Sequence, residues 1–185
     1  MPVNLPNLLT WLRIVLIPVF VGVFLLPFSW AGPLSAAIFA LASITDALDG
    51  YLARRLNQQS RFGAFLDPVA DKLIVVAALV LLVQVHGHIA LTVASIIIIG
   101  REIVISALRE WMAEIGRRAS VAVSGLGKLK TIAQMGAIFF MLYEAPFAGL
   151  PLFQIGEWLL YIAALLTVVS AGIYLRAAAA SLKGA

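Results

Sequence analysis

The sequence predicts an all-α, polytopic membrane protein with six transmembrane helices around a polar site in the cytosolic half. Of its 185 residues, 63% are hydrophobic and only 12% are charged, and its mean hydropathy is +1.05. A soluble domain carries about twice that charged fraction, so this chain lacks the polar side chains that an aqueous surface requires. Its apolar segments are also long enough to span a bilayer. We therefore expect residues 1–185 to form a single integral-membrane domain.

Breaks in the apolar sequence define the six expected helices. The charge-free stretch Ile14–Thr45 is too long for one span of roughly 20 residues. Pro27, Gly32 and Pro33 mark a loop within it. Pro18 falls inside the first helix and is expected to kink it, which membrane helices tolerate. The expected helices cover about Leu8–Leu26, Leu34–Arg55, Gly63–Val85, Ile89–Ile115, Lys128 to just before Pro146, and Glu157–Ala178.

Basic residues are distributed unevenly among the connections. The connections near 27–33, 86–90 and 144–157 contain no lysine or arginine. Such a bias places the basic connections in the cytosol, so we expect N-in, C-in topology with the active site facing the cytosol. Nucleic acid is not expected as a partner, because the charges form short clusters rather than one basic face. The clustered residues are Arg54, Arg55, Arg61, Arg117, Arg118, Lys128, Arg176 and Lys183.

The four aspartates of the chain lie within 26 residues, in two pairs. Asp46 and Asp49 are three residues apart and Asp67 and Asp71 are four apart, so each pair shares one face of its helix. Two adjacent helices that each turn a carboxylate pair inward form a cage of hard oxygen ligands, which suits Mg²⁺ or Mn²⁺. Carboxylates in a membrane are costly unless cations neutralise them, and the two pairs indicate two divalent metal ions.

Two other interpretations of the aspartates remain open at this point. Each aspartate could be matched to an arginine or lysine in a buried ion-pair network. The four could instead line the proton or cation pathway of a small transporter. Two metals about 4 Å apart, however, clamp an in-line displacement at phosphorus. The neighbouring residues favour this chemistry, since Gly50, Ala53 and Gly63 allow close approach of a ligand and Arg54 can hold a phosphate oxygen.

The pattern D-x-x-D-G-x-x-A-R-(x8)-G-x-x-x-D-x-x-x-D runs from Asp46 to Asp71 without a departure and resembles the signature of the CDP-alcohol phosphotransferases. The resemblance implies a six-helix membrane fold, usually dimeric, that displaces CMP from a CDP-linked lipid by an alcohol with two divalent metals. It implies that Asp46, Asp49 and Asp67 are metal ligands. It also implies that Asp71 lies at the second metal and is the catalytic base. The CDP-lipid pocket that it implies comprises Asn7, Thr10, Gly50, Ala53, Arg54, Ser60 and Gly63.

A second group of polar residues points to the acceptor alcohol. Arg101 and Arg109 are eight residues apart on one stripe of the fourth helix. Lys128 and Thr131 are three apart at the start of the fifth helix, with Lys130 beside them. Cations beside an already cationic metal site suit an acceptor that carries a phosphate, as glycerol 3-phosphate does and serine or choline does not. The alternative is that the cations other than Arg101 are ordinary charges at the cytosolic flank.

The segments around these cations, Gly100–Glu110 and Gly127–Thr131, resemble the bacterial members of the family that use glycerol 3-phosphate. The resemblance implies CDP-diacylglycerol as the donor, glycerol 3-phosphate as the acceptor, a homodimer, and the bacterial inner membrane as the location. The nearest alternative keeps the chemistry and changes the acceptor to inositol phosphate or phosphatidylglycerol. Glu102 and Glu110 are expected to pair with the arginines rather than to catalyse.

Overall fold

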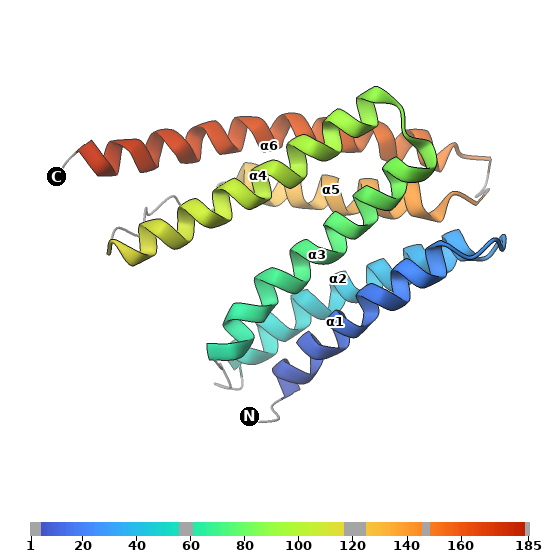
Figure 1. Ribbon diagram of the computed structural model, residues 1–185, viewed down its shortest axis with the longest axis horizontal. Helices are drawn as coiled ribbons and strands as arrows, with labels where there is room; N and C mark the ends of the chain where they lie inside the picture. The colour runs from blue at the N-terminus through green and yellow to red at the C-terminus, as the bar shows by residue number, and fades with distance from the viewer. Residues whose placement is uncertain (1–4, 56–60, 117–124, 146–148, 184–185) are drawn as a thin grey trace.

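The computed structural model has six α-helices among the residues that it describes (Figure 1). It describes residues 5–55, 61–116, 125–145 and 149–183. At positions 5–7, 47–55, 61–65, 67, 125–128 and 181–183 the description covers the backbone alone. The helices are α1 (Leu5–Phe24), α2 (Ala31–Arg55), α3 (Arg61–His86), α4 (Ile89–Glu114), α5 (Gly125–Tyr143) and α6 (Leu152–Lys183).

The number and order of the helices confirm the prediction, and the boundaries of α2, α3 and α4 are close to the expected ones. α1 is shifted toward the N-terminus relative to the expected Leu8–Leu26, and it remains helical through Pro18. α5 begins at Gly125, earlier than the expected start near Lys128. The helix therefore includes residues 125–127, which precede the predicted start and contain two glycines.

The limits of α6 differ most from the expected helix. It begins at Leu152 rather than near Glu157. The start follows directly on Pro151, and proline is well suited to the beginning of a helix because its fixed φ matches the helical value. The helix continues to Lys183, because the alanine run 177–180 has the highest intrinsic preference for helix.

A tight turn joins α3 to α4, and one of its residues contacts α6. A Cβ atom on Gly87 would overlap the carbonyl oxygen of Val83, so glycine is required there. His88 caps α4, since its Nδ1 accepts a hydrogen bond from the backbone N–H of Leu91 at 3.3 Å. The Nε2 atom of His88 pairs with Glu157 of α6. The histidine therefore fixes the start of α4 against α6.

Figure 1 shows the helices in two groups that meet at one end of the molecule. α1 packs along α2 and also contacts α3, whereas α6 packs along α5 and also contacts α4. Contacts of α2 with α5, and of α3 with α4 and α5, join the two groups. From their shared turn α3 and α4 diverge, so the start of α3 and the end of α4 lie apart, at the end of the molecule that also holds the start of α1 and the end of α6.

Apolar side chains fill the interior and also cover the outside. Phe39, Leu79 and Ile138 are completely or almost completely buried, while Ile132 and Trp158 on the outer faces are 71% and 68% exposed. Exposed apolar surface of this extent is expected of a multi-pass membrane protein. α1, α2 and α5 each contribute a shorter apolar segment. The segments that are long and apolar enough to cross a membrane are Pro68–His86, Ile89–Glu114 and Leu152–Ala180.

Candidate functional site

The two aspartate pairs fall on adjacent helices near the end at which the helices diverge. Asp46 lies in α2 and Asp71 in α3, and both side chains are partly buried. The two carboxylates are close enough for their charges to interact. The side chains of Asp49 and Asp67 lie outside the described part of the structure. One member of each pair therefore faces the same region between α2 and α3.

Arg13 of α1 forms an ion pair with Asp46. Its Nη1 atom donates to Asp46 Oδ1 at 2.5 Å, and its side chain is 0% exposed, against 38% for Asp46. Arg13 is not among the site residues predicted from the sequence, although a lone arginine within an apolar helix is a signal of function. The ion-pair interpretation thus holds for Asp46. It leaves room for a metal, because a carboxylate has about four lone-pair positions.

A small polar cavity lies beside Asp71. Its volume is about 30 Å³, which is space for roughly two water molecules. Apolar residues of α3 and α4 close its remaining walls. Its polar lining comes from α3, α4 and α5, namely Asp71, Lys72, Glu102 and Gln134.

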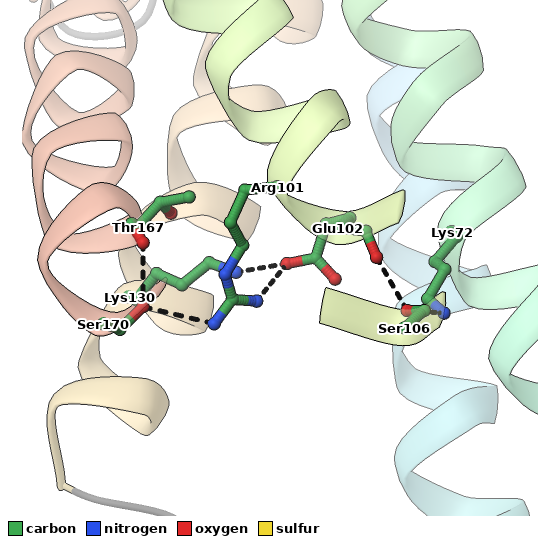
Figure 2. A network of polar contacts seen from close by, with 7 residues as sticks. All are labelled: Lys72, Arg101, Glu102, Ser106, Lys130, Thr167 and Ser170. Atoms are coloured by element: carbon green, nitrogen blue, oxygen red, sulfur yellow. Dashed lines mark hydrogen bonds and ion pairs between the residues drawn. The ribbon is translucent and has the colours of Figure 1, made fainter. Parts of the chain in front are cut away.

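Glu102 is the centre of a polar network that joins α4, α5 and α6 (Figure 2). Its Oε1 atom accepts a hydrogen bond from Arg101 Nη1 at 2.8 Å and pairs with Lys130 Nζ. The expected pairing of Glu102 with an arginine is therefore confirmed. Arg101 Nη2 also donates to Ser170 Oγ at 3.2 Å, and Ser170 donates to the carbonyl oxygen of Thr167 at 3.0 Å.

A second branch of the network reaches the aspartate-bearing helix α3. Lys72 follows Asp71 in the chain and donates from Nζ to Ser106 Oγ, and Ser106 donates to the carbonyl oxygen of Glu102 at 2.6 Å. Lys72, the neighbour of Asp71 in α3, and the cations Arg101 and Lys130 of α4 and α5 thus belong to one connected polar network. Lys72 and Ser106 are not among the site residues predicted from the sequence, although a lysine beside an aspartate in an apolar helix is a signal for the first of them.

Arg101 and Lys130 are held in place by Glu102 rather than projecting freely. Lys130 is only 5% exposed, and the Arg101 side chain is 17% exposed. Two cations and one carboxylate leave one net positive charge in this cluster. A charge that is buried and fixed by hydrogen bonds acts more strongly on a neighbouring anion than one in water.

Arg109 lies in a wider groove between the diverging parts of α3 and α4. The groove has a volume of about 530 Å³, and Lys72 and Ser106 also line it. The exposed guanidinium of Arg109 lies 5.2 Å from the centre of the Tyr174 ring, within the range of a cation–π interaction. The aromatic ring fixes the orientation of the guanidinium and leaves its charge in the groove.

The other predicted site residues fall into two sets. Thr10 is buried, with 2% of its surface exposed, and Thr131 is exposed. Neither side chain is assigned to a ligand by the structure. The rest lie outside the described residues or the described side chains, namely Asn7, Gly50, Ala53, Arg54, Ser60, Gly63 and Lys128.

The site brings carboxylates and cations close together. The carboxylates of Asp46, Asp71 and Glu102 come from α2, α3 and α4, and the cations Lys72, Arg101 and Lys130 come from α3, α4 and α5. Hard oxygen donors suit a divalent cation, and fixed arginine and lysine side chains suit a phosphate. A site of this kind could hold a phosphate-bearing molecule beside a divalent cation.

Comparison with known proteins gives the same chemistry. A sequence model of the CDP-alcohol phosphatidyltransferase family matches residues 3–169. The CDP-diacylglycerol–glycerol-3-phosphate 3-phosphatidyltransferase of Pectobacterium atrosepticum is 54% identical over 180 residues, which are 96% of each chain. The protein of the same name from Salmonella typhimurium is 52% identical over 182 residues, again 96% of each chain. The one from Escherichia coli (strain K12) is 50% identical over 186 residues, or 98% of each chain.

Proposed function

The chain belongs to the CDP-alcohol phosphatidyltransferase family, and we propose that it transfers the phosphatidyl group of CDP-diacylglycerol to sn-glycerol 3-phosphate. The products are phosphatidylglycerophosphate and CMP, which makes the protein an enzyme of phospholipid biosynthesis. The observation that carries this function is an identity of 50% to 54% to proteins named for this reaction, over 96% to 98% of the chain. Because the chain belongs to this family of transferases, we assign the aspartates to an enzyme's active site rather than to the ion pathway of a transporter.

We propose that two divalent ions, Mg²⁺ or Mn²⁺, bind to the four aspartates, Asp46, Asp49, Asp67 and Asp71. The described part of this set fits such ions, since Asp46 and Asp71 offer hard oxygen donors on adjacent helices with interacting charges. Bound there, the ions supply charge neutralisation at the diphosphate of the CDP-lipid.

Asp71 is the proposed general base. It takes the proton of the C1 hydroxyl of glycerol 3-phosphate, and that oxygen then forms a bond to the lipid-bearing phosphorus. The bond between this phosphorus and the oxygen bridging to CMP breaks, and CMP leaves with the electron pair toward the cytosol. The cavity beside Asp71 supports this role, because a hydroxyl group has space to approach the carboxylate there.

The donor and the acceptor occupy different parts of the proposed site. The phosphate of the acceptor is assigned to cations of α4 and α5, where Glu102 holds Arg101 and Lys130 and the groove contains Arg109. Lys128 and Thr131 complete that set by their position at the start of α5. The CDP-lipid is assigned to Asn7, Thr10, Gly50, Ala53, Arg54, Ser60 and Gly63, as the family resemblance implies.

Arg109→Ala is expected to raise the KM for glycerol 3-phosphate by roughly 10- to 100-fold, because a charge-assisted hydrogen bond to phosphate is lost. The KM for CDP-diacylglycerol should stay within about twofold, since Arg109 lies in the groove on the α4 side. Steady-state kinetics of CMP release, with each substrate varied in turn, provide the measurement.

Arg176→Ala is the matched control, because Arg176 is an exposed arginine on α6 that does not line the groove. It should leave both KM values unchanged. If Arg109→Ala raises both KM values equally, the assignment of the groove to the acceptor phosphate is wrong.

The proposed enzyme crosses the bacterial inner membrane six times, with both termini and the active site on the cytosolic side. The uneven distribution of lysine and arginine among the connections supports this orientation. Among the described residues, Pro68–His86, Ile89–Glu114 and Leu152–Ala180 are long and apolar enough to cross a membrane, and we assign the other three crossings to the shorter apolar segments of α1, α2 and α5. A homodimer is the oligomeric state that the family resemblance implies.

The proposed function is tested with purified protein, CDP-diacylglycerol and a panel of alcohols. CMP should form with glycerol 3-phosphate, and at a much lower rate with inositol phosphate, phosphatidylglycerol, serine or choline. A faster reaction with inositol phosphate or phosphatidylglycerol would keep the chemistry and change the acceptor. No CMP with any alcohol would refute the function.

A further inference from the structure

Gln134 of α5 is a buried polar residue that the proposed reaction does not yet use. Its side chain is 6% exposed. The Oε1 atom is buried and finds no hydrogen-bond partner within the described residues. A buried acceptor without a donor costs roughly 1 to 3 kcal/mol, so its presence needs an explanation.

The unpartnered oxygen belongs to a residue of the cavity beside Asp71. Gln134 follows Lys130 by four residues, so the two lie on the same face of α5, one turn apart. Lys130 is held by Glu102, and both Glu102 and Gln134 line the cavity with Asp71. Gln134 thus shares the cavity with the proposed base and with Glu102, which holds the proposed phosphate-binding cations Arg101 and Lys130.

The chemistry of the cavity lining selects a hydrogen-bond donor. Asp71, Glu102 and Gln134 all offer oxygen acceptors, whereas the one cation among the described lining residues, Lys72, directs one of its three N–H groups to Ser106. A volume of about 30 Å³ admits one or two atoms the size of a water oxygen. The cavity therefore suits the one or two hydroxyl oxygens of a small alcohol better than a phosphate group.

We propose that Gln134 recognises the hydroxyl of the acceptor that does not react, the C2 hydroxyl of glycerol 3-phosphate, by accepting its hydrogen bond at Oε1. This inference rests on the proposed function. The C2 carbon adjoins the C1 carbon in the three-carbon chain, so with the C1 hydroxyl at Asp71 the C2 hydroxyl lies within reach of Gln134, which lines the same cavity. Gln134 is then a residue that determines acceptor specificity.

The test compares glycerol 3-phosphate with 3-hydroxypropyl phosphate, which has the same chain and phosphate but no C2 hydroxyl. For the unmodified enzyme, kcat/KM should favour glycerol 3-phosphate by roughly 10- to 100-fold, because a buried acceptor stays unpaired with the analogue. Gln134→Met keeps the length of the side chain and removes the oxygen. It should reduce this preference to about twofold or less, mainly by slowing the reaction of glycerol 3-phosphate.

Two further variants make the outcome decisive. Gln84→Met, at the opposite end of α3, should retain the full preference. Gln134→Asn keeps the carboxamide and serves where Gln134→Met does not fold; it should retain part of the preference. Equal kcat/KM for both acceptors with the unmodified enzyme, or an unchanged ratio in Gln134→Met, overturns the inference and leaves the proposed function intact. No CMP with either acceptor overturns both.

Discussion

Asp71→Asn is expected to lower kcat for phosphatidyl transfer by at least about 10²- to 10⁴-fold, the usual contribution of a general base. The amide has nearly the same shape as the carboxylate but cannot take the proton of the attacking hydroxyl. The cavity beside residue 71 should persist, because its other walls come from neighbouring positions of α3 and from α4 and α5. CMP release from CDP-diacylglycerol at saturating glycerol 3-phosphate measures the effect.

Metal binding distinguishes loss of the base from collapse of the site. The carboxamide introduced by Asp71→Asn would retain one oxygen, and three aspartates of the motif would be unchanged, so divalent ions should still bind in part. Glu114→Gln is the control, since Glu114 is an exposed carboxylate at the end of α4 and its loss should leave kcat unchanged. Turnover of Asp71→Asn within about twofold of the unmodified enzyme would remove Asp71 from the role of base.

Removal of divalent ions is expected to stop CMP release completely. Without them, the negative charge that develops on the diphosphate would meet the carboxylates of Asp46 and Asp71 with no counter-charge between. Activity should return when Mg²⁺ or Mn²⁺ is added in excess of the chelator.

The fold itself should survive chelation, because Arg13 already supplies a counter-charge to Asp46. Circular dichroism of the detergent-solubilised protein, recorded with and without chelator, provides the control. Full activity in excess chelator, with the ions shown to be absent, would contradict the metal-dependent mechanism.

The helices and the aspartate motif could be predicted from the sequence because their signals are local. Apolar runs have the length of a bilayer crossing, and breaks such as Pro27 and Gly87 fall between helices. Asp46 and Asp71 could be recognised as functional from their local sequence alone, since carboxylates within apolar membrane helices are rare outside functional sites. The cations Arg101 and Arg109 were selected in the same way, by charge and spacing.

The contacts between helices could not be predicted in the same way. A membrane helix is apolar on both its lipid-facing and its core-facing sides, so periodicity does not show which face turns inward. The pairing of Arg13 with Asp46 joins residues 33 positions apart, and that of Lys130 with Glu102 joins residues 28 apart. The sequence did not indicate a functional role for Gln134, because the role proposed for it depends on a cavity that is lined by residues of three helices.

A count of bound metal ions tests the central claim most directly. Electron paramagnetic resonance of Mn²⁺ added to the purified protein with CDP-diacylglycerol gives the number of ions held per chain. We expect two ions per chain in the unmodified enzyme and fewer after Asp46→Asn or Asp67→Asn. An unmodified enzyme that forms CMP while it binds no Mn²⁺ and no Mg²⁺ would contradict it.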